Sequence, residues 1–389
     1  MTPLTGLQEW LDSTRGELDG AREALSVTQA TVAALTTELG NAQAALQRQQ
    51  AEFASYIASQ SPTIGESRCA ALDYSSDRSP ERAAMLARFP LAILSYGASR
   101  PDHLAAVREA NPRIKLARYV KASEWKNITT QYDVMHTARL QIDANNWWLR
   151  TASGKLTQQM GQEGQYDVHH ADWYPWKAAH DGPTVQGFDA IFVDNVVAST
   201  RAPADWNRSG TFDLAAGTAA ANAAYCGGYG VYLAELLRLY GLPLIGNVET
   251  KPNFSPARPE YKGKLRWGYV EGITGASFSP AEPVETILLV QASGITPIAA
   301  VRGDTPEELL YGLCIGLMAD GLTSMLPRTT PAGFKSRYDA PLIWMPEFDL
   351  RIGQPEGPAY KTGAIWRRDY ANARVVVDTA ARSGRIERV

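Results

Sequence analysis

The stretch GFDAIFVDNV, residues 187–196, decides the fold that the sequence predicts. Its middle, residues 190–193, is a short apolar run with β-branched and aromatic side chains, which is typical of a strand buried on both faces. The run ends in Asp194 and Asn195, two polar residues at the point where a buried strand surfaces. In parallel α/β folds, catalytic groups lie at the C-terminal ends of the strands. Asp194 is therefore a candidate site residue, the alternative being a turn cap or an ion pair with an arginine.

Seven further apolar runs of strand length flank this stretch along the chain. We expect the eight strands at residues 68–74, 91–96, 115–121, 189–196, 243–249, 267–273, 295–301 and 322–326. Helices are expected between most of them, at 80–88, 101–110, 213–240, 280–293 and 306–320, with proline near their starts and glycine after an end. This alternation predicts a (β/α)8 TIM barrel. A doubly wound open sheet is the alternative, but no glycine-rich phosphate loop follows any of the strands.

The first 57 residues carry a heptad repeat that is separate from the barrel pattern. The a positions are all apolar, and the d positions are apolar or small except for three polar ones. The a positions are Leu4, Leu11, Leu18, Leu25, Val32, Leu39, Leu46 and Phe53, and the d positions are Leu7, Thr14, Ala21, Thr28, Leu35, Ala42, Gln49 and Tyr56. Heptads sustained over this length predict a parallel coiled coil, with a helix folded back on its own domain as the alternative. Two or three strands both fit, and we favour a homotrimer joined through residues 4–57.

The domain organisation follows from these patterns. Residues 1–58 are expected to form a coiled-coil stalk, residues 59–67 a hinge and residues 68–328 the barrel. Residues 329–389 are expected to form a small β-rich appendage packed on the barrel, because two strand-like runs flank residues 369–373 as in a hairpin.

Composition narrows the function classes. A net charge of −3 over 389 residues gives no reason to expect nucleic acid or an anionic membrane as a partner. The three cysteines, Cys69, Cys226 and Cys314, have no metal-ligand spacing, so buried reduced thiols are expected, with no metal and no cofactor. No apolar run reaches membrane-spanning length, and the N-terminus has no pattern of a secretory signal peptide.

The barrel prediction brings polar and aromatic residues to the mouth. Carboxylates, amides and aromatic rings dominate the strand ends and the long insertion at 122–187. Besides Asp194 and Glu271, the candidate substrate-binding residues are Asp73, Tyr74, Tyr96, Tyr119, Trp148, Asp172, Trp173, Asn195, Asn247, Glu249 and Arg302. Two carboxylates among aromatic and amide groups are what glycosidic cleavage needs, because one acid protonates the leaving oxygen while the other group attacks carbon or activates water. For each ring the alternative is core packing, and for each glutamate it is an ion pair.

Four segments together resemble a family of proteins. Residues 187–196, 148–155 (WLRTASGK), 267–272 (WGYVEG) and 366–377 (WRRDYANARVVV) are similar to a group of barrel glycoside hydrolases, which includes the "hypothetical glycosyl hydrolase" families and, more distantly, the polygalactosaminidase-like enzymes. The resemblance covers residues 68–389. It implies that Asp194 is the carboxylate at the end of the fourth strand and that Glu271 is its partner at the sixth. Asp378-Thr379 departs from the group, which tends to have asparagine and proline there.

The sequence thus indicates a glycan-directed barrel on a coiled-coil stalk. A glycan-directed protein without an export signal suits a virion component released by lysis, and we expect a phage tail-fibre or tail-tip receptor-binding protein that binds, and as a glycoside hydrolase cleaves, host surface polysaccharide. Its expected location is the virion tail or the extracellular space, with another structural protein at its N-terminal end. A non-catalytic carbohydrate-binding tip and a bacterial, cytoplasmic glycoside hydrolase are the alternatives. Asp194 is expected to act as nucleophile or base, and Glu271, in an apolar setting, as general acid.

Overall fold

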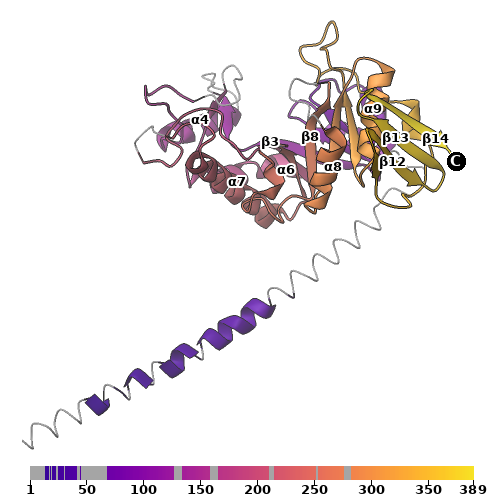
Figure 1. Cartoon of the computed structure of the whole chain (residues 1–389). Coiled ribbons are helices and arrows are strands. Elements are labelled where there is room, and N and C mark those ends of the chain that lie inside the picture. The colour runs from indigo at the N-terminus through magenta and orange to yellow at the C-terminus, as the bar shows by residue number, and fades with distance from the viewer. Residues whose placement is uncertain are drawn as a thin grey trace, which may run out of the picture. The chain divides into compact units, whose positions relative to one another are not determined.

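The computed structural model describes residues 14–16, 18, 20–22, 25–29, 31–41, 44, 68–126, 134–157, 165–209, 214–250, 253–275 and 282–389. The chain divides into two compact units, Met1–Ser61 and Pro62–Val389 (Figure 1). Among the helices in the described ranges, none combines the length and the apolar character that crossing a membrane requires.

The second unit is built on eight strands that close into a parallel barrel. The strands are β1 (Cys69–Asp73), β2 (Leu91–Leu94), β3 (Lys115–Lys121), β6 (Ala190–Val196), β7 (Leu244–Val248), β8 (Trp267–Thr274), β9 (Thr296–Arg302) and β10 (Leu322–Leu326). They are hydrogen-bonded in the closed order β1-β10-β9-β8-β7-β6-β3-β2, and each pair is parallel. The predicted (β/α)8 barrel is confirmed, and each of its strands lies where the sequence placed a strand, to within two residues at either end.

The central strand β6 shows why the apolar run at its middle predicted a doubly buried strand. Ala190 and Phe192 face the barrel interior, where Phe192 stacks on Tyr119 of β3. Ile191 and Val193 face outward and join the core between the barrel and its helices. Side chains of a strand alternate between its two faces, so a strand inside a helix-covered barrel must be apolar at every position.

Five helices follow the barrel strands at the expected places. They are α2 (Pro80–Leu86), α3 (Pro101–Ala110), α7 (Ala219–Tyr240), α8 (Pro283–Ala292) and α9 (Pro306–Leu317). Side-chain oxygens of Ser79, Thr218 and Thr305 accept hydrogen bonds from backbone N–H groups in the first turns of α2, α7 and α9. The Thr218 cap sets the start of α7, six residues later than the sequence suggested. Gly241 ends the helix with a left-handed backbone (φ 62°).

Two connections depart from a regular alternation of strand and helix. In the described part of the connection after β7 there is a 3-10 turn, η1 (Ser255–Ala257), and no α-helix. Between β3 and β6 the described residues 122–126, 134–157 and 165–187 form a lobe. It contains β4 (Glu124–Lys126), α4 (Val134–Ala144), β5 (Gln165–Asp167), α5 (Trp173–His180) and α6 (Gly182–Val185). The lobe packs on α7 (Figure 1). Its Tyr174 ring lies so close to Gly228 of α7 that a Cβ there would meet ring carbon at 2.1 Å.

An antiparallel sheet follows the barrel. Its strands, in spatial order, are β11 (Tyr360–Thr362), β12 (Ile365–Tyr370), β13 (Ala373–Asp378) and β14 (Ser383–Arg388), and a short turn, η2 (Pro346–Asp349), precedes them. β12 and β13 form the predicted hairpin. Arg368 and Tyr370 of β12 donate hydrogen bonds to the carbonyl of Leu317 at the end of α9, which ties the sheet to the barrel.

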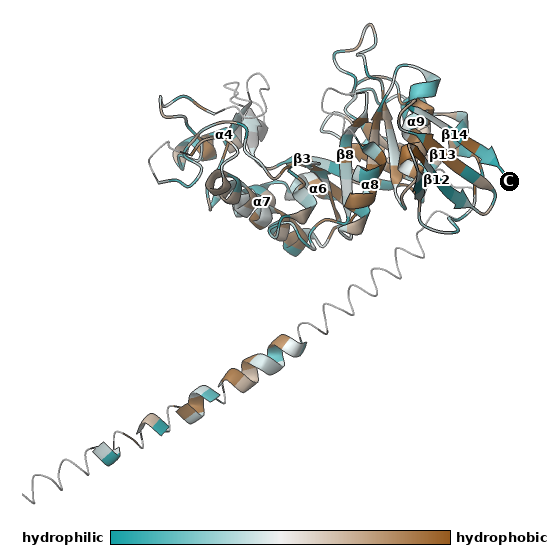
Figure 2. Ribbon diagram, viewed as in Figure 1, coloured by the Kyte–Doolittle hydropathy of each residue, from teal (hydrophilic) through white to brown (hydrophobic). Residues whose placement is uncertain are grey.

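The first unit contributes helix wherever the structure describes it. Its heptad leucines Leu18, Leu25, Leu35 and Leu39 are 53–60% exposed in the single chain. Hydrophobic and hydrophilic residues alternate along this helix (Figure 2). A helix with an uncovered apolar stripe is what a coiled-coil strand looks like without its partners, and the coiled coil itself stays a prediction.

Candidate active site

Asp194 lies where β6 loses its regular pairing with β7. Val193 pairs with Gly246, but Val196 pairs with Val248, so β6 contains one extra residue at this point. The backbone of Asn195 is left-handed (φ 59°). Such β-bulges are frequent at barrel rims and next to active sites, because they redirect a side chain out of the regular alternation. The bulge thus accounts for polar residues at the end of a strand whose first four residues are all apolar.

Asp194 is buried, with 9% of the residue exposed to solvent. Hydrogen-bond donors surround its carboxylate. Its Oδ1 accepts from the backbone N–H of Asn195 at 2.9 Å and from Nδ2 of Asn247 at 2.8 Å. Its Oδ2 accepts from the hydroxyl of Tyr119, and Nζ of Lys121 lies 3.7 Å away. These donors fix both oxygens in space.

Glu271 occupies a second irregularity, between β8 and β9. Val270 pairs with Ala299 and Thr274 with Val301, so β8 holds two extra residues here, and Gly272 is left-handed (φ 63°). Oε1 of Glu271 accepts hydrogen bonds from Arg302 and from the hydroxyl of Tyr338, both at 2.5 Å. The expected apolar setting of Glu271 is therefore wrong: the sequence neighbours are apolar, but the side chain leaves the strand at the bulge and meets a cation, a phenol and an amide.

Asn247 of β7 joins the two carboxylates. Its Nδ2 lies 2.8 Å from Oδ1 of Asp194 and 3.1 Å from Oε2 of Glu271. An amide nitrogen carries two N–H bonds at about 120° to each other, so acceptors on both bonds stand about 5 Å apart. The structure therefore brings the two predicted carboxylates together across the single strand that separates β6 from β8.

Three tyrosines connect the same two carboxylates on another side. Tyr119 donates to Asp194 and Tyr338 donates to Glu271. The ring of Tyr74 lies between them, stacked on Tyr338 at 4.9 Å and edge-on to Tyr119 at 5.0 Å. Burial raises the pKa of each of the three phenols, above all that of Tyr74 and Tyr119, so their hydroxyls remain proton donors. Tyr338 was not predicted from the sequence, because it follows the last barrel strand in a segment with no regular pattern.

Asp73, a predicted substrate-binding residue, helps to hold the segment that carries Tyr338. Its buried carboxylate forms an ion pair with Arg82 of α2, whose guanidinium also donates to the carbonyl of Ala340 at 3.1 Å and 3.2 Å. The N–H of Tyr74 donates to the carbonyl of Tyr338 at 3.1 Å. These bonds attach the segment that carries Tyr338 to β1, and they leave Asp73 fully buried.

Glu249 and Asn195, two further candidates, hold the chain that leaves β6. The carboxylate of Glu249 accepts from the N–H of Ala198 at 2.9 Å and from Oγ of Ser199 at 3.1 Å and 3.2 Å. Asn195 is buried, and its carbonyl accepts a hydrogen bond from Tyr225. Their hydrogen bonds therefore hold the loop that follows Asp194.

Tyr96 lies at the end of β2 and is 46% exposed. The guanidinium of Arg118, itself buried, stands 3.9 Å from the centre of its ring. One face of the ring is thus covered by a cation, and the side chain remains accessible to solvent at the barrel rim.

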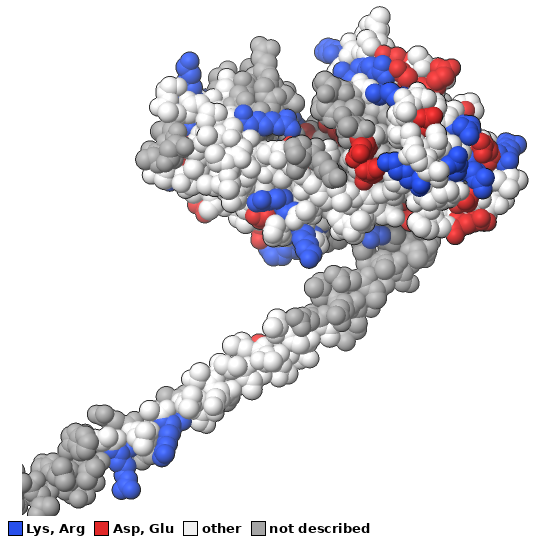
Figure 3. Space-filling model, viewed as in Figure 1, with Lys and Arg blue, Asp and Glu red and all other residues white. Residues whose placement is uncertain are grey.

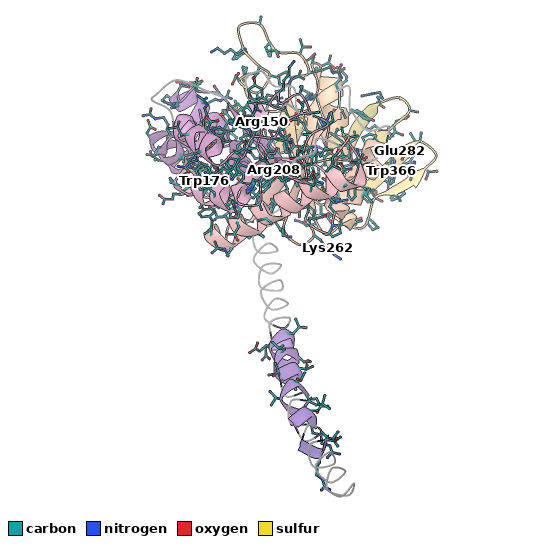
Figure 4. The ribbon with its side chains drawn as sticks, turned by 90° about the vertical axis from the view of Figure 1, so that its left-hand side faces the viewer. Arg150, Trp176, Arg208, Lys262, Glu282 and Trp366 are labelled. Atoms are coloured by element: carbon teal, nitrogen blue, oxygen red, sulfur yellow. The ribbon has the colours of Figure 1, made fainter. Side chains whose placement is uncertain are left out.

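The candidates in the lobe have different surroundings. Trp148 and Trp173 are buried, and their indole N–H groups donate to Asp143 and to the carbonyl of Ala122. Both rings belong to the core of the lobe, while the side chain of Asp172 is 79% exposed. The lobe faces the viewer in Figure 4, where Arg150, Trp176 and Arg208 are labelled. Arg208 donates to the carbonyls of His169 and Trp147, both at 2.6 Å, and so fastens the segment after β6 to the lobe.

The surface agrees with the near-neutral charge. On the face shown in Figure 3, acidic and basic side chains are interspersed, and the domain is hollowed between the lobe and the part that carries the C-terminal sheet, with acidic atoms visible in the hollow. In the described ranges no group of histidine, cysteine, aspartate and glutamate side chains is arranged to hold a metal ion.

Comparison with known proteins identifies the class of fold. No family model matches the sequence, and no curated protein does. Among solved structures the barrel is similar to those of several glycoside hydrolases, and this similarity shows a (β/α)8 fold. A variant of the GH36 alpha-galactosidase AgaA from Geobacillus stearothermophilus, in complex with 1-deoxygalactonojirimycin, aligns with a TM-score of 0.50 and 8% identity over 80% of this chain and 47% of that one.

Two other solved structures align less closely. The cycloalternan-forming enzyme from Listeria monocytogenes, with a pentasaccharide substrate, aligns with a TM-score of 0.47 and 10% identity over 70% of this chain and 30% of that one. The Tris-bound glucosidase II alpha subunit aligns with a TM-score of 0.44 and 11% identity over 72% of this chain and 33% of that one. The chain spans about half the length of the alpha-galactosidase structures it matches.

Proposed function

We propose that the barrel is a glycan-directed enzyme that hydrolyses a surface polysaccharide, with Asp194 and Glu271 as its catalytic pair. The observation that carries the proposal is the bridge of Asn247, whose two N–H bonds reach Oδ1 of Asp194 and Oε2 of Glu271 and so imply that these two oxygens stand about 5 Å apart. Retaining glycosidases hold their two carboxyl groups about 5–5.5 Å apart, whereas inverting ones need about 6.5–9.5 Å to admit a water molecule. The short separation supports a double-displacement reaction.

In that reaction an Asp194 oxygen attacks the anomeric carbon as the bond to the leaving oxygen breaks. Glu271 donates the proton that the leaving oxygen takes. Water then attacks the glycosyl–Asp194 ester, gives its proton to Glu271 and releases the sugar. Oε2 of Glu271 is the oxygen suited to carry the proton, because Oε1 is held by Arg302 and Tyr338, while Oε2 is bonded to Asn247 on the side of Asp194.

A non-catalytic glycan-binding role is the second candidate. The ion pair between Glu271 and Arg302 favours it, since a guanidinium and a carboxylate can hold each other as a fixed binding group without taking part in chemistry. A barrel that kept its shape and lost its chemistry would bind sugars through the same amide, phenol and carboxylate groups.

We further propose that residues 4–57 assemble three copies of the chain into a parallel coiled-coil stalk. The exposed heptad leucines support assembly, and the flanking charges support the parallel orientation. The e positions carry Arg15 and Arg22, whereas the g positions carry Glu17 and Glu38. In a parallel coiled coil a g position lies beside the e position of the next heptad on the neighbouring helix, which pairs Glu17 with Arg22 of a neighbour. In an antiparallel coiled coil g positions would face g positions and e positions would face e positions.

A glycan-directed head on such a stalk is the architecture of a phage tail-fibre or tail-tip receptor-binding component, located in the virion tail or outside the cell and attached at its N-terminal end to another structural protein. A bacterial glycoside hydrolase that its helix oligomerises is the alternative.

The decisive experiment incubates the purified full chain with host surface polysaccharides and measures new reducing ends and product sizes. Asp194→Asn should abolish release of product while thermal unfolding and glycan binding remain as in the parent chain. Glu271→Gln should lower the rate for glycosides with poor leaving groups more than for activated aryl glycosides. Binding without products from the parent chain on any glycan would favour the binding role.

A further inference from the structure

Buried tyrosine hydroxyls surround the backbone that carries Asp194. Tyr229 donates to the carbonyl of Asp194 at 3.1 Å, and Tyr225 donates to the carbonyl of Asn195 at 2.8 Å. Tyr261 donates to the carbonyl of Val197 at 2.8 Å. All three side chains are fully buried. The carbonyls of Asp194, Asn195 and Val197 thus each accept a hydrogen bond from a tyrosine side chain.

The elements that carry these tyrosines explain the arrangement. Tyr225 and Tyr229 stand four residues apart on α7, so they share one face of that helix. Tyr261 comes from the connection after β7, and the thiol of Cys226 lies near the carbonyls of Val197 and Ala198. A phenylalanine would fill the same space without the donor. The carbonyl of Asn195 would keep the N–H of Val197 at 2.8 Å and that of Val197 the weak thiol donor of Cys226, and the loss of the stronger donor at a buried carbonyl is costly. At all three tyrosine positions the hydroxyl is therefore the group that matters for the bulge.

The bulge depends on such support. The extra residue in β6 shifts its register against β7, while Asp194 still pairs with Lys121 of β3, and Asn195 adopts a left-handed backbone that only a well-determined environment maintains. The N–H of Asn195 in turn donates to Oδ1 of Asp194. A change in the bulge would therefore move a donor of the Asp194 carboxylate as well as its Cα.

We propose that Tyr225, Tyr229 and Tyr261 are positioning residues, which hold the β6 bulge and thereby set the direction of the Asp194 carboxylate. Their catalytic consequence rests on the proposed role of Asp194, whereas their hold on the bulge does not. Burial raises the pKa of Tyr225 and Tyr261 well above the ordinary value of 10, so both remain protonated donors in the working pH range. The hydroxyl of Tyr229 also lies 3.1 Å from Oγ of Ser123, which orients it.

The test replaces each tyrosine by phenylalanine in the full chain. Tyr232→Phe is the matched control. Tyr232 lies on α7 with Tyr225 and Tyr229 and is equally buried, but its hydroxyl donates to the side chain of Asp181 and not to the bulge. Hydrogen–deuterium exchange is followed in peptides that cover residues 192–200. Each of the three variants should exchange these amides on the order of tenfold faster than the parent chain, while Tyr232→Phe should leave them unchanged. Equal acceleration in all four variants, or in none, would overturn the proposal.

Enzyme kinetics provide the second measurement. With an active parent chain, the three variants should lose about tenfold to a hundredfold in kcat with little change in KM, since the substrate still binds but meets a displaced carboxylate. Tyr232→Phe should keep the parent kcat. If the variants exchange faster at 192–200 but the parent chain cleaves no glycan, the proposed function fails and the role of the tyrosines in holding the bulge remains. Unchanged exchange at 192–200 in the variants of an active enzyme would remove the positioning role and leave the proposed function unaffected.

Discussion

Asp194 and Glu271 stand at corresponding irregularities of the barrel: each lies in a bulge near the end of its strand, and each is followed by a residue with a left-handed backbone, Asn195 and Gly272. In a regular strand the side chains alternate between the barrel interior and the helix layer. The two bulges interrupt that alternation on both sides of β7, and Asn247 of that strand reaches both carboxylates. The backbone, and not only the residue types, builds the pair.

The stereochemistry of the reaction is the first consequence. If the chain cleaves a glycoside, the product should have the same anomeric configuration as the substrate, because carboxylates about 5 Å apart leave no room for a water molecule between Asp194 and the sugar. Proton NMR of the first-formed sugar, taken before mutarotation, measures this directly. An inverted product would mean that the two carboxylates separate when substrate binds.

Tyr338→Phe should weaken catalysis without unfolding the protein. The change removes one donor to Oε1 of Glu271 and leaves the ring stacked on Tyr74. We expect kcat to fall about tenfold, which corresponds to about 1.4 kcal/mol, the scale of one hydrogen bond to a charged group. Tyr360→Phe is the control, since that exposed hydroxyl donates to Asp369 in the C-terminal sheet. An unchanged kcat in Tyr338→Phe would show that the phenol has no part in the reaction.

The free energy of unfolding of the domain should decrease at low pH, because His169 is buried in its neutral form. Burial, with a further contribution from the nearby Arg208, lowers the pKa of His169 from 6.5 to about 3. The unfolded chain therefore takes up a proton below pH 6.5 that the folded chain refuses. The free energy of unfolding is fully maintained above pH 6.5 and is lost as the pH falls toward 3, by about 1.4 kcal/mol per pH unit.

Urea unfolding at pH 7 and pH 4.5 measures this effect. His169→Asn, which keeps a polar group near the hydroxyl of Tyr174, should reduce the difference between the two pH values by about 2–3 kcal/mol. Equal pH dependence in the parent chain and in His169→Asn would show that this histidine is not the source.

Removal of the stalk should separate assembly from folding. A chain that begins at Ser61 keeps the whole barrel and the C-terminal sheet, so it should unfold at the temperature of the parent domain and sediment as a monomer. Analytical ultracentrifugation of both forms compares their masses. A tight oligomer without the heptad region would show that the barrel domains themselves associate.

The barrel could be predicted from the sequence because its strands contain short apolar runs that are buried on both faces, as Ile191 to Val193 illustrate. The start of α7 could not be placed, because residues before Thr218 have helical composition while Thr218 itself caps the helix. Asp194, Asn247 and Glu271 were found because they follow apolar runs, and strands of a closed barrel end at one rim.

The buried surroundings of three other candidate residues have a common physical explanation. Asp73 also ends a strand, yet Arg82 neutralises it behind the rim, and no local pattern reveals a partner nine residues further on that also bonds to Ala340. Trp148 and Trp173 are the same residue type as a sugar-stacking ring, but the lobe folds around them. Whether a polar or aromatic residue serves the core or the site depends on tertiary contacts, which strand periodicity does not encode.

The attachment of the 336–340 segment to β1 has a consequence for how this fold can be divided. A (β/α)8 barrel is often treated as a self-sufficient module that ends with its eighth strand. Here Leu326 closes the barrel, yet a phenol that contacts Glu271 comes from twelve residues further along. A chain cut after β10 would retain every strand of the barrel and both carboxylates but lose a donor of one of them. The chemical unit is therefore longer than the architectural one, and grafting the barrel onto another stalk or host protein must carry the following segment with it.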